Sequence, residues 1–385
     1  MSQNGRTAGW LAMLFSLLTG LTVSCGRTNS APGNAVVTIS NVEPRRDTTG
    51  EIIDAHDGCL QFFNGRFYLY GTAYGTNDGY GDANRYRVYS SPDLGQWQFE
   101  GELLHGQPKG VYYRPYVVFN ARTRKYVLWY NWYAKLWQGQ EGVAISDTPV
   151  GPFTIVNTNL SLAHADPGDG SLFVDDDGTG YYIYSTLNDG GTVRVERLTP
   201  DYLATTGETS GLLAIGTESP VLFRRNNLYY ALCGPRCNAC AEGSEAQVLV
   251  SRAPLGPYIS RPESNINHQL ADAGSLTATQ QIWTVTLSSA NTNGILPDGS
   301  EKKIPMIIRT KNRPLIPAQE TWVAKIPTPG GPVFIWMADR WGSAPDGVKG
   351  HDLQYWSLPL EFDPNGDIRP LANVAQWQIT RAPEN

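Results

Sequence analysis

The stretch that decides the fold is SLFVDDDGTGYYIYSTLNDGGTVRVERLTP, residues 171–200. A short apolar run is followed by an Asp-Gly turn, then by an aromatic run, then by a third run that ends at Thr199-Pro200. Short runs rich in aromatic and β-branched residues, bounded by turn residues, are typical of β-strands, and Asp-Gly favours a hairpin. The stretch therefore predicts consecutive antiparallel strands.

The same pattern recurs along the chain. Further copies begin at Cys59, Tyr116, Pro220 and, more loosely, Thr321. Matching tyrosines at 68, 126, 181 and 229 are separated by 58, 55 and 48 residues. Repeats of about 40–50 residues with four strands each indicate propeller blades. We expect an all-β fold, a five-bladed β-propeller. The alternative, a β-sandwich with accidental similarity, is disfavoured because both halves of the pattern recur in order.

Three segments are predicted. Residues 1–24 are expected to be a signal peptide, residues 25–41 a flexible tether, and residues 42–385 the propeller. An insertion at about 260–318 precedes the last blade. The tether prediction rests on the Ser, Pro, Gly and Asn residues between positions 29 and 41, a composition typical of linkers.

The first residues have the pattern of an export signal. Arg6 is the only charge before the apolar run 10–24, which is too short to span a bilayer comfortably. Cys25 follows that run as in a bacterial lipoprotein signal, although Thr22 stands where Leu is usual; an ordinary cleaved signal is the alternative. We expect a secreted protein, or a cell-surface or periplasmic lipoprotein whose one membrane contact is a lipid on Cys25.

Composition limits the partners. Hydrophobic residues make up 41% and aromatic residues 11% of the chain, enough for a sizeable core and for aromatic sugar-binding clefts. The formal net charge of −6 argues against nucleic acid, which needs a basic face. The expected partner is a polysaccharide or an oligosaccharide, with no nucleic acid.

Four cysteines lie beyond Cys25. They are Cys59, Cys233, Cys237 and Cys240. Export favours disulfides, and four cysteines allow three pairings, one of which would tie the loop of the fourth blade to Cys59. Zinc is the alternative for the last three, but no His lies nearby to complete a tetrahedral site.

Polar residues stand at the first strand of every predicted blade. These are Asp54-Ala55-His56-Asp57-Gly58, Tyr113-Arg114-Pro115, Asp169-Gly170, Glu218-Ser219-Pro220 and Gln319. Innermost strands line the central channel of a propeller, so one such group per blade predicts a site at its mouth. Asp175, Asp176 and Asp177 look like metal ligands but are interpreted as solvated turn residues.

These segments resemble glycoside hydrolase family 43, and within it the branch that contains exo-β-1,3-galactanases. The resemblance covers about residues 50–380. It rests on residues 55–58, Arg114-Pro115 with Phe119-Asn120, Asp169 before 172–178, Glu218-Ser219-Pro220 with Phe223, 318–323, 339–341 and 355–360. The resemblance implies a propeller that hydrolyses glycosidic bonds.

The resemblance also implies roles for two carboxyl groups. Glu218 matches the family's general acid, and Asp169 matches the carboxylate that orients the acid and tunes its pKa. The structural alternatives are a Glu that hydrogen-bonds a blade turn and an ordinary turn Asp.

The residue that activates water is left open by the sequence. Most of the family has a general-base Asp at the first strand of the first blade, where this chain has Asp57. The galactanase branch has Gly there and relies on a Gln of the last blade, which Gln319 matches. Gln281 is a second glutamine candidate. Asp57 as a base and Asp57 as a turn cap are equally open.

Substrate contacts are expected from five residues. They are Tyr113, Arg114, Trp132, Trp341 and His56. Each Trp has blade core as its alternative, and His56 has a hydrogen-bonded core position. The galactanases have Glu where this chain has Tyr113, which puts galactan specificity in doubt. No cofactor is required and no metal ligand is assigned, although a structural calcium ion is allowed because some family propellers hold a central cation.

Three functions follow from the sequence. The first is an inverting, exo-acting glycosidase of a galactan-like or other plant or algal polysaccharide. The second is an α-L-arabinofuranosidase or β-xylosidase of the same family, favoured if Asp57 is the base. The third is a non-catalytic sugar-binding propeller.

Overall fold

A computed structural model describes residues 36–235, 239–268, 282–287, 302–307 and 314–380. The chain divides into Met1–Gly33, which lies outside the described residues, and Asn34–Asn385, to which this description applies. Within the described residues, the regular structure is 23 β-strands and one short 3-10 helix, η1 (Lys349–His351). The fold is all-β, as the sequence predicts, and no described helix is long and apolar enough to cross a membrane.

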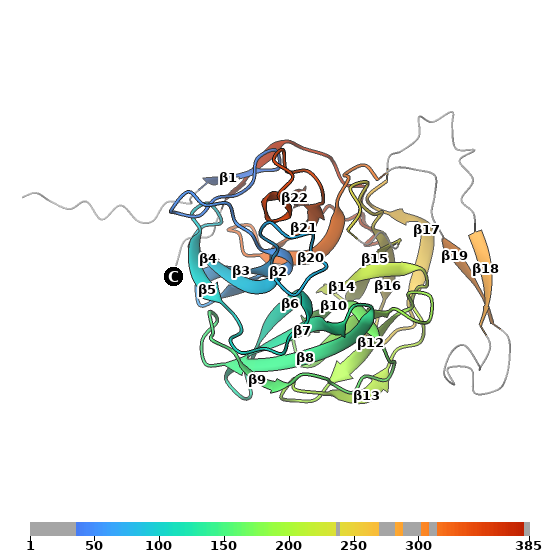
Figure 1. The fold of residues 1–385 in the computed structure, drawn as a ribbon. Helices are drawn as coiled ribbons and strands as arrows, with labels where there is room; N and C mark the ends of the chain where they lie inside the picture. Colours follow the sequence, from blue (N-terminus) through green and yellow to red (C-terminus); the bar gives the residue numbers. More distant parts are fainter. Residues whose placement is uncertain (1–35, 236–238, 269–281, 288–301, 308–313, 381–385) are drawn as a thin grey trace, which may run out of the picture. The chain divides into compact units, whose positions relative to one another are not determined.

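Five antiparallel sheets form the blades of a propeller (Figure 1). Blade 1 has β2 (His56–Phe63), β3 (Arg66–Ala73), β4 (Arg85–Ser91) and β5 (Gln98–Glu102). Blade 2 has β6 (Val111–Asn120), β7 (Lys125–Lys135), β8 (Gln138–Ser146) and β9 (Thr154–Asn157). Blade 3 has β10 (Pro167–Val174), β11 (Gly180–Thr186), β12 (Val193–Leu198) and β13 (Thr205–Thr209). Blade 4 has β14 (Thr217–Arg225), β15 (Leu228–Pro235), β16 (Gln247–Ser251) and β17 (Ile259–Asn265), and blade 5 has β20 (Gln319–Ile326), β21 (Val333–Arg340) and β22 (Leu353–Pro359). The five-bladed prediction is confirmed.

The innermost strands contact one another in a closed ring: β2 packs on β6, β6 on β10, β10 on β14, β14 on β20, and β20 on β2. Each of them carries a β-bulge where its pairing register shifts against the second strand of the blade. A bulge bends a strand locally and re-aims the side chains of its extra residues. The extra residues are Asp57-Gly58, Arg114, Gly168-Asp169, Ser219-Pro220 and Thr321.

The two ends of the described chain form a separate two-stranded sheet. Strand β1 (Val36–Ser40) pairs antiparallel with β23 (Gln376–Thr380), so the propeller begins inside the segment that was expected to be a tether. Asn41 ties this pair to blade 5: its amide nitrogen donates to the Trp356 carbonyl at 3.0 Å, and its amide oxygen accepts from the Trp356 N–H at 2.9 Å. The buried Asn41 side chain thus supplies the two hydrogen bonds that join it to the main chain of β22 in blade 5.

Aromatic residues fill the space between blades. Trp97 of blade 1 meets Trp356 of blade 5 edge to face, and Trp129 of blade 2 lies 4.9 Å from Tyr182 of blade 3, measured between ring centroids. All four rings are buried, which explains why the repeat places aromatic residues on its second strands and at its turns. Large aromatic side chains therefore fill much of the contact between neighbouring sheets.

The predicted disulfide to Cys59 is wrong. Cys59 and Cys233 are free, buried thiols, and burial raises the pKa of each to about 12. Each lies on a strand and packs as a small apolar side chain in a blade core. Cys240 is in a disulfide, whereas Cys237 and Cys25 lie outside the described residues.

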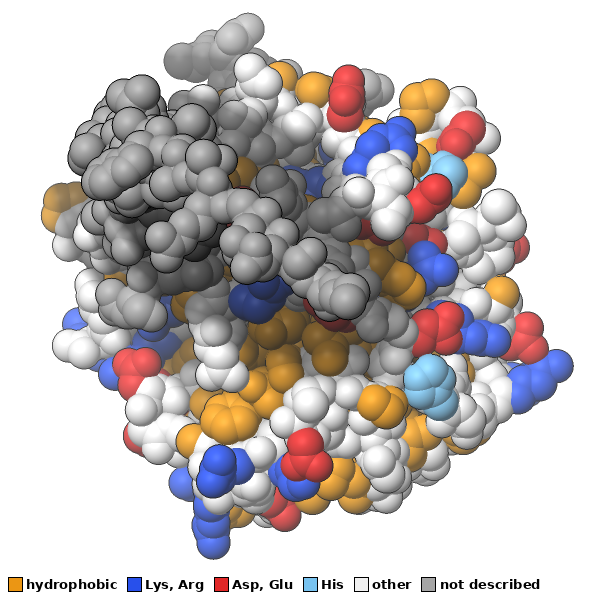
Figure 2. All heavy atoms as spheres, turned by 90° about the vertical axis from the view of Figure 1, so that its left-hand side faces the viewer, with side chains coloured by type: hydrophobic (Ala, Val, Ile, Leu, Met, Phe, Trp, Pro, Cys, Tyr) orange, Lys and Arg blue, Asp and Glu red, His pale blue; other side chains and the backbone are white. Residues whose placement is uncertain are grey.

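The predicted insertion contributes a two-stranded hairpin, β18 (Ile282–Leu287) with β19 (Lys302–Ile307). It starts later than expected, because β17 still belongs to blade 4. Figure 2 shows one side of the structure, on which the described acidic and basic side chains are interspersed rather than segregated. Over those described residues, that side offers no continuous basic face of the kind that binds nucleic acid.

Candidate active site

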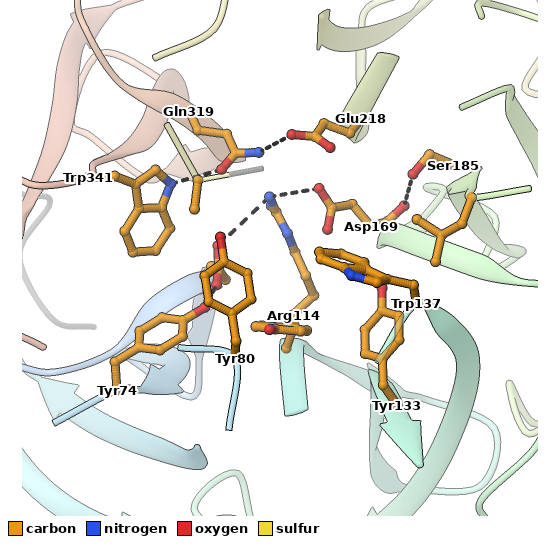
Figure 3. Close-up of a pocket in the computed structure, with 14 residues that line it drawn as sticks. Tyr74, Tyr80, Arg114, Tyr133, Trp137, Asp169, Ser185, Glu218, Gln319 and Trp341 are labelled. Atoms are coloured by element: carbon orange, nitrogen blue, oxygen red, sulfur yellow. Dashed lines mark hydrogen bonds and ion pairs between the residues drawn. The ribbon is translucent and has the colours of Figure 1, made fainter. Parts of the chain in front are cut away.

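A pocket at the end of the ring where the bulges lie is lined by all five blades and the loops beside them. The lining residues are Asp57, Tyr74, Tyr80, Tyr113, Arg114, Tyr133, Trp137, Asp169, Ser185, Leu187, Glu218, Ala239, Gln319 and Trp341. Figure 3 shows the polar ends of Gln319, Glu218, Asp169 and Arg114 converging, with aromatic rings around them. Every carboxyl group predicted for the site is therefore in one place.

The bulges explain how the polar residues reach the pocket. Asp57, Arg114 and Ser219 have φ values of 58°, 55° and 56°, in the left-handed region that non-glycine residues seldom adopt. Pro115 and Pro220 follow two of these residues at the bulges, where a strand tolerates a missing N–H. Gly58 is required for packing, because a Cβ there would lie 1.8 Å from the Tyr70 carbonyl oxygen. Backbone conformation at the ring, rather than loop length, aims these side chains.

Gln319 is held in a single orientation by its neighbours. The Trp341 indole N–H, which can only donate, lies 2.8 Å from the Gln319 amide oxygen. The Gln319 amide nitrogen must then face the other way, and it donates to Glu218 Oε1 at 2.9 Å and to Ser219 Oγ at 2.8 Å. This donor fixes the orientation of the Glu218 carboxyl group.

Arg114 and Asp169 form the charged centre of the site. An Arg114 guanidinium nitrogen lies 3.1 Å from Asp169 Oδ2 and donates to Ser219 Oγ at 2.6 Å. Asp169 Oδ2 also accepts from the Ser219 N–H at 3.1 Å and the Ser219 hydroxyl at 2.9 Å. Burial disfavours the Arg114 charge, but Asp169 and its other neighbours outweigh it and keep the pKa of Arg114 above its usual value. Asp169 therefore fixes the residue next to Glu218.

Asp57 lies close to Arg114, at 3.8 Å from its guanidinium. Its carboxylate accepts a short hydrogen bond from the Tyr74 hydroxyl, and its main-chain N–H donates to Asp339 Oδ2 at 2.7 Å. Burial raises the pKa of Asp57, and the nearby Asp339 and Asp169 raise it further, against the lowering effect of Arg114 and Tyr74. A buried carboxylate that binds protons more readily than usual is suited to the role of a general base.

Two predicted substrate contacts are wrong in position. Trp132 is buried, stacks on Tyr112 within blade 2 and donates its indole N–H to the Thr158 carbonyl at 2.6 Å. His56 is also buried and does not line the pocket: Nδ1 bonds Asp339 Oδ1 at 3.0 Å and Nε2 bonds the Gly350 carbonyl at 3.3 Å. Burial works against its charge, but Asp339 outweighs this and raises the pKa of His56 to about 9.

The other three residues predicted to contact substrate, Tyr113, Arg114 and Trp341, line the pocket. The Tyr113 hydroxyl donates to the Gly79 carbonyl at 2.7 Å. Gln281 lies outside the described residues. Asp175 is not a solvated turn residue: it is buried, bonds Arg224 Nη1 at 2.5 Å and accepts from the Tyr229 hydroxyl at 2.5 Å.

Calcium stays a prediction. Among the described residues, no group of three or more His, Cys, Asp or Glu side chains is arranged to hold a metal ion. Two acidic groups of the site have protein partners: Asp339 binds His56 and the Asp57 N–H, and Asp169 binds Arg114.

Sequence reasoning missed most of the aromatic lining. Tyr74, Tyr80, Tyr133 and Trp137 lie in or beside connections between strands, where the blade repeat gives no guide. One signal was available for Trp137: it interrupts the strand pattern at Leu136-Trp137, and a large aromatic in a tight turn has no blade core to fill. Tyr74, at the end of the second strand of blade 1, carried no such signal.

Solved structures with the same fold include two exo-β-1,3-galactanases. One, from Clostridium thermocellum, is 23% identical, with 88% of this chain and 66% of that chain covered and a TM-score of 0.66. A variant from Phanerochaete chrysosporium, crystallised with β-1,3-galactotriose, is 21% identical, with 89% and 68% covered and a TM-score of 0.67. At these identities the likeness establishes the fold.

Two curated relatives are similar in sequence, and both are arabinoxylan arabinofuranohydrolases. The protein from Bacillus subtilis is 26% identical in an alignment of length 268 that covers 54% of this chain and 50% of that protein. The protein from Paenibacillus polymyxa is 29% identical in an alignment of length 147 that covers 30% of this chain and 22% of that protein. The chain thus matches half or less of the length of these relatives.

A family profile gives the broader assignment. The profile for glycosyl hydrolases family 43 matches residues 65–289, more than half of the chain. The match begins after β2 of blade 1, runs through blade 4 and includes Asp169 and Glu218. With its five blades and its acidic pocket, the chain belongs to glycosyl hydrolases family 43.

Proposed function

We propose that this protein is an inverting glycosidase that removes single sugars from the end of a galactan-like polysaccharide. The observation that carries the proposal is that Glu218 of blade 4 and Asp57 of blade 1 line one pocket, with Arg114 and Gln319 beside them. Inversion requires an acid at the leaving oxygen and a separate base that activates water on the opposite face of the sugar. A pocket, rather than an open groove, accommodates a chain end.

Glu218 acts as the acid. Its carboxyl proton is transferred to the glycosidic oxygen as the bond from C1 to that oxygen breaks. Gln319 holds Oε1 at 2.9 Å, and Trp341 keeps the amide from turning over. Gln319 therefore supports the acid, and Trp341 already occupies one of the two acceptor sites of its amide oxygen.

Asp57 acts as the base. Its carboxylate takes a proton from a water molecule whose oxygen forms the new bond to C1, so the released sugar has the opposite anomeric configuration. Tyr74 orients the carboxylate, and Arg114 offers positive charge 3.8 Å away. Asp169 holds Ser219 and Arg114 in place and so positions the acid, but it does not itself transfer a proton.

The sugar is proposed to be β-1,3-linked galactose, because the solved structures of similar fold include enzymes described as exo-β-1,3-galactanases. The second candidate is an α-L-arabinofuranoside. It is favoured by the presence of a carboxylate at Asp57 and by the arabinofuranohydrolases among the sequence relatives. The galactanases have Glu where this chain has Tyr113, whose hydroxyl donates to the Gly79 carbonyl. This difference counts against galactan as the substrate.

The test is sugar release by residues 36–385 from galactans, arabinans and xylans, with Glu218→Gln and the exposed Glu208→Gln as a matched control. Glu218→Gln should lose activity by about 100-fold or more, the range for a positioned acid, and Glu208→Gln should not. Proton NMR of the first product gives its anomeric configuration. Binding of a glycan without release by either protein would replace the proposal by the non-catalytic sugar-binding propeller.

We also propose that the protein is exported, with Cys25 as the lipid-bearing residue. The support is the charged start, the short apolar run and the position of Cys25 after Ser24. Expression of the full chain and of Cys25→Ser, followed by fractionation, tests this. The wild type should be in the membrane fraction and the variant should be released; equal distribution of the two would contradict lipidation.

A further inference from the structure

Two half-exposed aromatic rings stand at the mouth of the pocket. Tyr80 is 42% exposed and Trp137 is 46% exposed, and both line the pocket that contains Glu218 and Asp57. Their ring centroids are 6.2 Å apart. Most other aromatic residues of the described chain are buried between the blades, so this pair leaves apolar surface open beside charged groups.

The pair is held from both sides. Trp137 lies in the tight turn between β7 and β8, with φ of 69°, and its ring meets the buried Tyr133 edge to face at 6.2 Å. Tyr80 follows Gly79, whose carbonyl accepts from the Tyr113 hydroxyl at 2.7 Å and the Asn84 amide at 3.0 Å. The rings are anchored through their neighbours while part of their surface faces solvent.

The exposure of the pair marks the open end of the pocket. Three other aromatic rings that line it, those of Tyr74, Tyr133 and Trp341, are buried. An exo-acting enzyme holds the terminal sugar inside its pocket, so the leaving group extends through the open end and passes these two exposed rings.

We propose that Tyr80 and Trp137 form the binding surface for the leaving-group sugar, a pyranose unit that stacks its apolar C–H face on the two rings. The inference rests on the proposed function, since it takes the sugar to be released to lie inside the pocket. It assigns a substrate class: oligosaccharides and polysaccharides in which a hexopyranose follows the bond that is cleaved. Small glycosides whose leaving group has no ring would gain nothing from this surface.

The test compares two substrates that share the sugar to be released. β-1,3-Galactobiose has a pyranose leaving group, and β-D-galactosyl fluoride has only fluoride. Trp137→Ala should lower kcat/KM for galactobiose about tenfold, since a contact of this kind contributes ~1–1.5 kcal/mol and ~1.4 kcal/mol is a factor of ten. The same variant should leave kcat/KM for the fluoride within about twofold of wild type.

Three further variants sharpen the comparison. Tyr80→Ala should repeat the selective loss, Trp137→Phe should retain most of the galactobiose activity, and Phe99→Ala should change neither substrate. Phe99 is the matched control because it is 44% exposed on β5 and does not line the pocket. If the substrate panel selects arabinofuranosides, an arabinofuranosyl-xylobiose and arabinofuranosyl fluoride replace this pair.

Equal losses on both substrates, or no loss on either, would overturn the inference while leaving the proposed function standing. If the wild type hydrolyses neither substrate, the proposed function fails separately. Calorimetry with galactobiose then decides the inference, because equal affinity of wild type and Trp137→Ala would reject the binding surface.

Discussion

Replacing Asp57 by Asn tests which group activates water. The change keeps the shape of the side chain and removes its capacity to take a proton. A positioned base contributes about 10²–10⁴-fold to the rate, or ~3–5 kcal/mol of the activation barrier. We expect a loss of kcat of at least about 100-fold. Tyr74 and Arg114 remain beside residue 57 in the variant, so the loss reports the missing base rather than a change in its surroundings.

The pH profile gives the second readout. Burial raises the pKa of Asp57, so the acid limb of wild-type kcat/KM should lie above the ordinary carboxyl value of ~3.9, with activity lost as pH falls through that pKa. The Asp57→Asn variant should lack this limb. Added azide, which needs no base, should restore turnover and give a glycosyl azide of inverted configuration.

Stability separates this effect from misfolding. A carboxyl whose pKa is higher in the folded state destabilises the fold as pH rises through the unfolded and then the folded value. Removing the charge should therefore not lower Tm at pH 7, and Arg114 keeps its partner Asp169 at 3.1 Å. The exposed Asp147→Asn serves as a control. Retention of more than about a tenth of wild-type kcat, with an unchanged acid limb, would refute Asp57 as the base and return the role to Gln319.

Three further predictions concern two residues near the site and the contact of Asn41 with blade 5. Lys349 Nζ lies 3.9 Å from the Trp341 ring centroid, the arrangement of a cation–π contact. In steady-state assays Lys349→Met should lower kcat about 2–5-fold, and Lys349→Arg should restore it. Equal kinetics for both variants would contradict a cation–π role. Burial raises the pKa of Glu320 from 4.5 to about 8, so the free energy of unfolding of the wild type should fall as pH rises across that range. Urea unfolding at several pH values should show a weaker pH dependence of this free energy for Glu320→Gln. The same pH dependence in both proteins would count against the prediction. Asn41→Ala removes three side-chain hydrogen bonds, two of them to the Trp356 main chain. In denaturant titrations it should lower the free energy of unfolding by about 3 kcal/mol. A change under ~1 kcal/mol would mean that the contact between Asn41 and blade 5 is redundant.

The sequence predicted the blades well because each blade must bury aromatic residues at nearly the same place. It also brought Glu218, Asp169, Asp57 and Gln319 together, since all four stand at the first strand of a blade and those strands meet at one axis. The bulges that aim them were not predicted. A bulge is a property of the register between two strands, which the sequence of one strand does not reveal.

Errors occurred where a residue's role depends on which face of a strand it occupies. Trp132 and Trp137 are five positions apart in one hairpin; the first packs on Tyr112 inside blade 2, and the second projects at the turn. Cys59 was paired because export favours disulfides, yet it fills a core position with no partner sulfur. Asp175 was assigned to solvent, although Arg224 and Tyr229 of the next blade enclose it. Each error depends on contacts between segments about 40 or more residues apart, or on side-chain direction.

The pairing of β1 with β23 has a consequence for how the chain can be connected. Val36 lies opposite Thr380 in the register, so the two ends of the described propeller are neighbours. A short linker could join them, and new ends could be opened at the Asn64-Gly65 or Asp177-Gly178 turn. Such circular permutants should fold and keep the pocket, because the ring depends on which blades are adjacent and not on which blade is translated first.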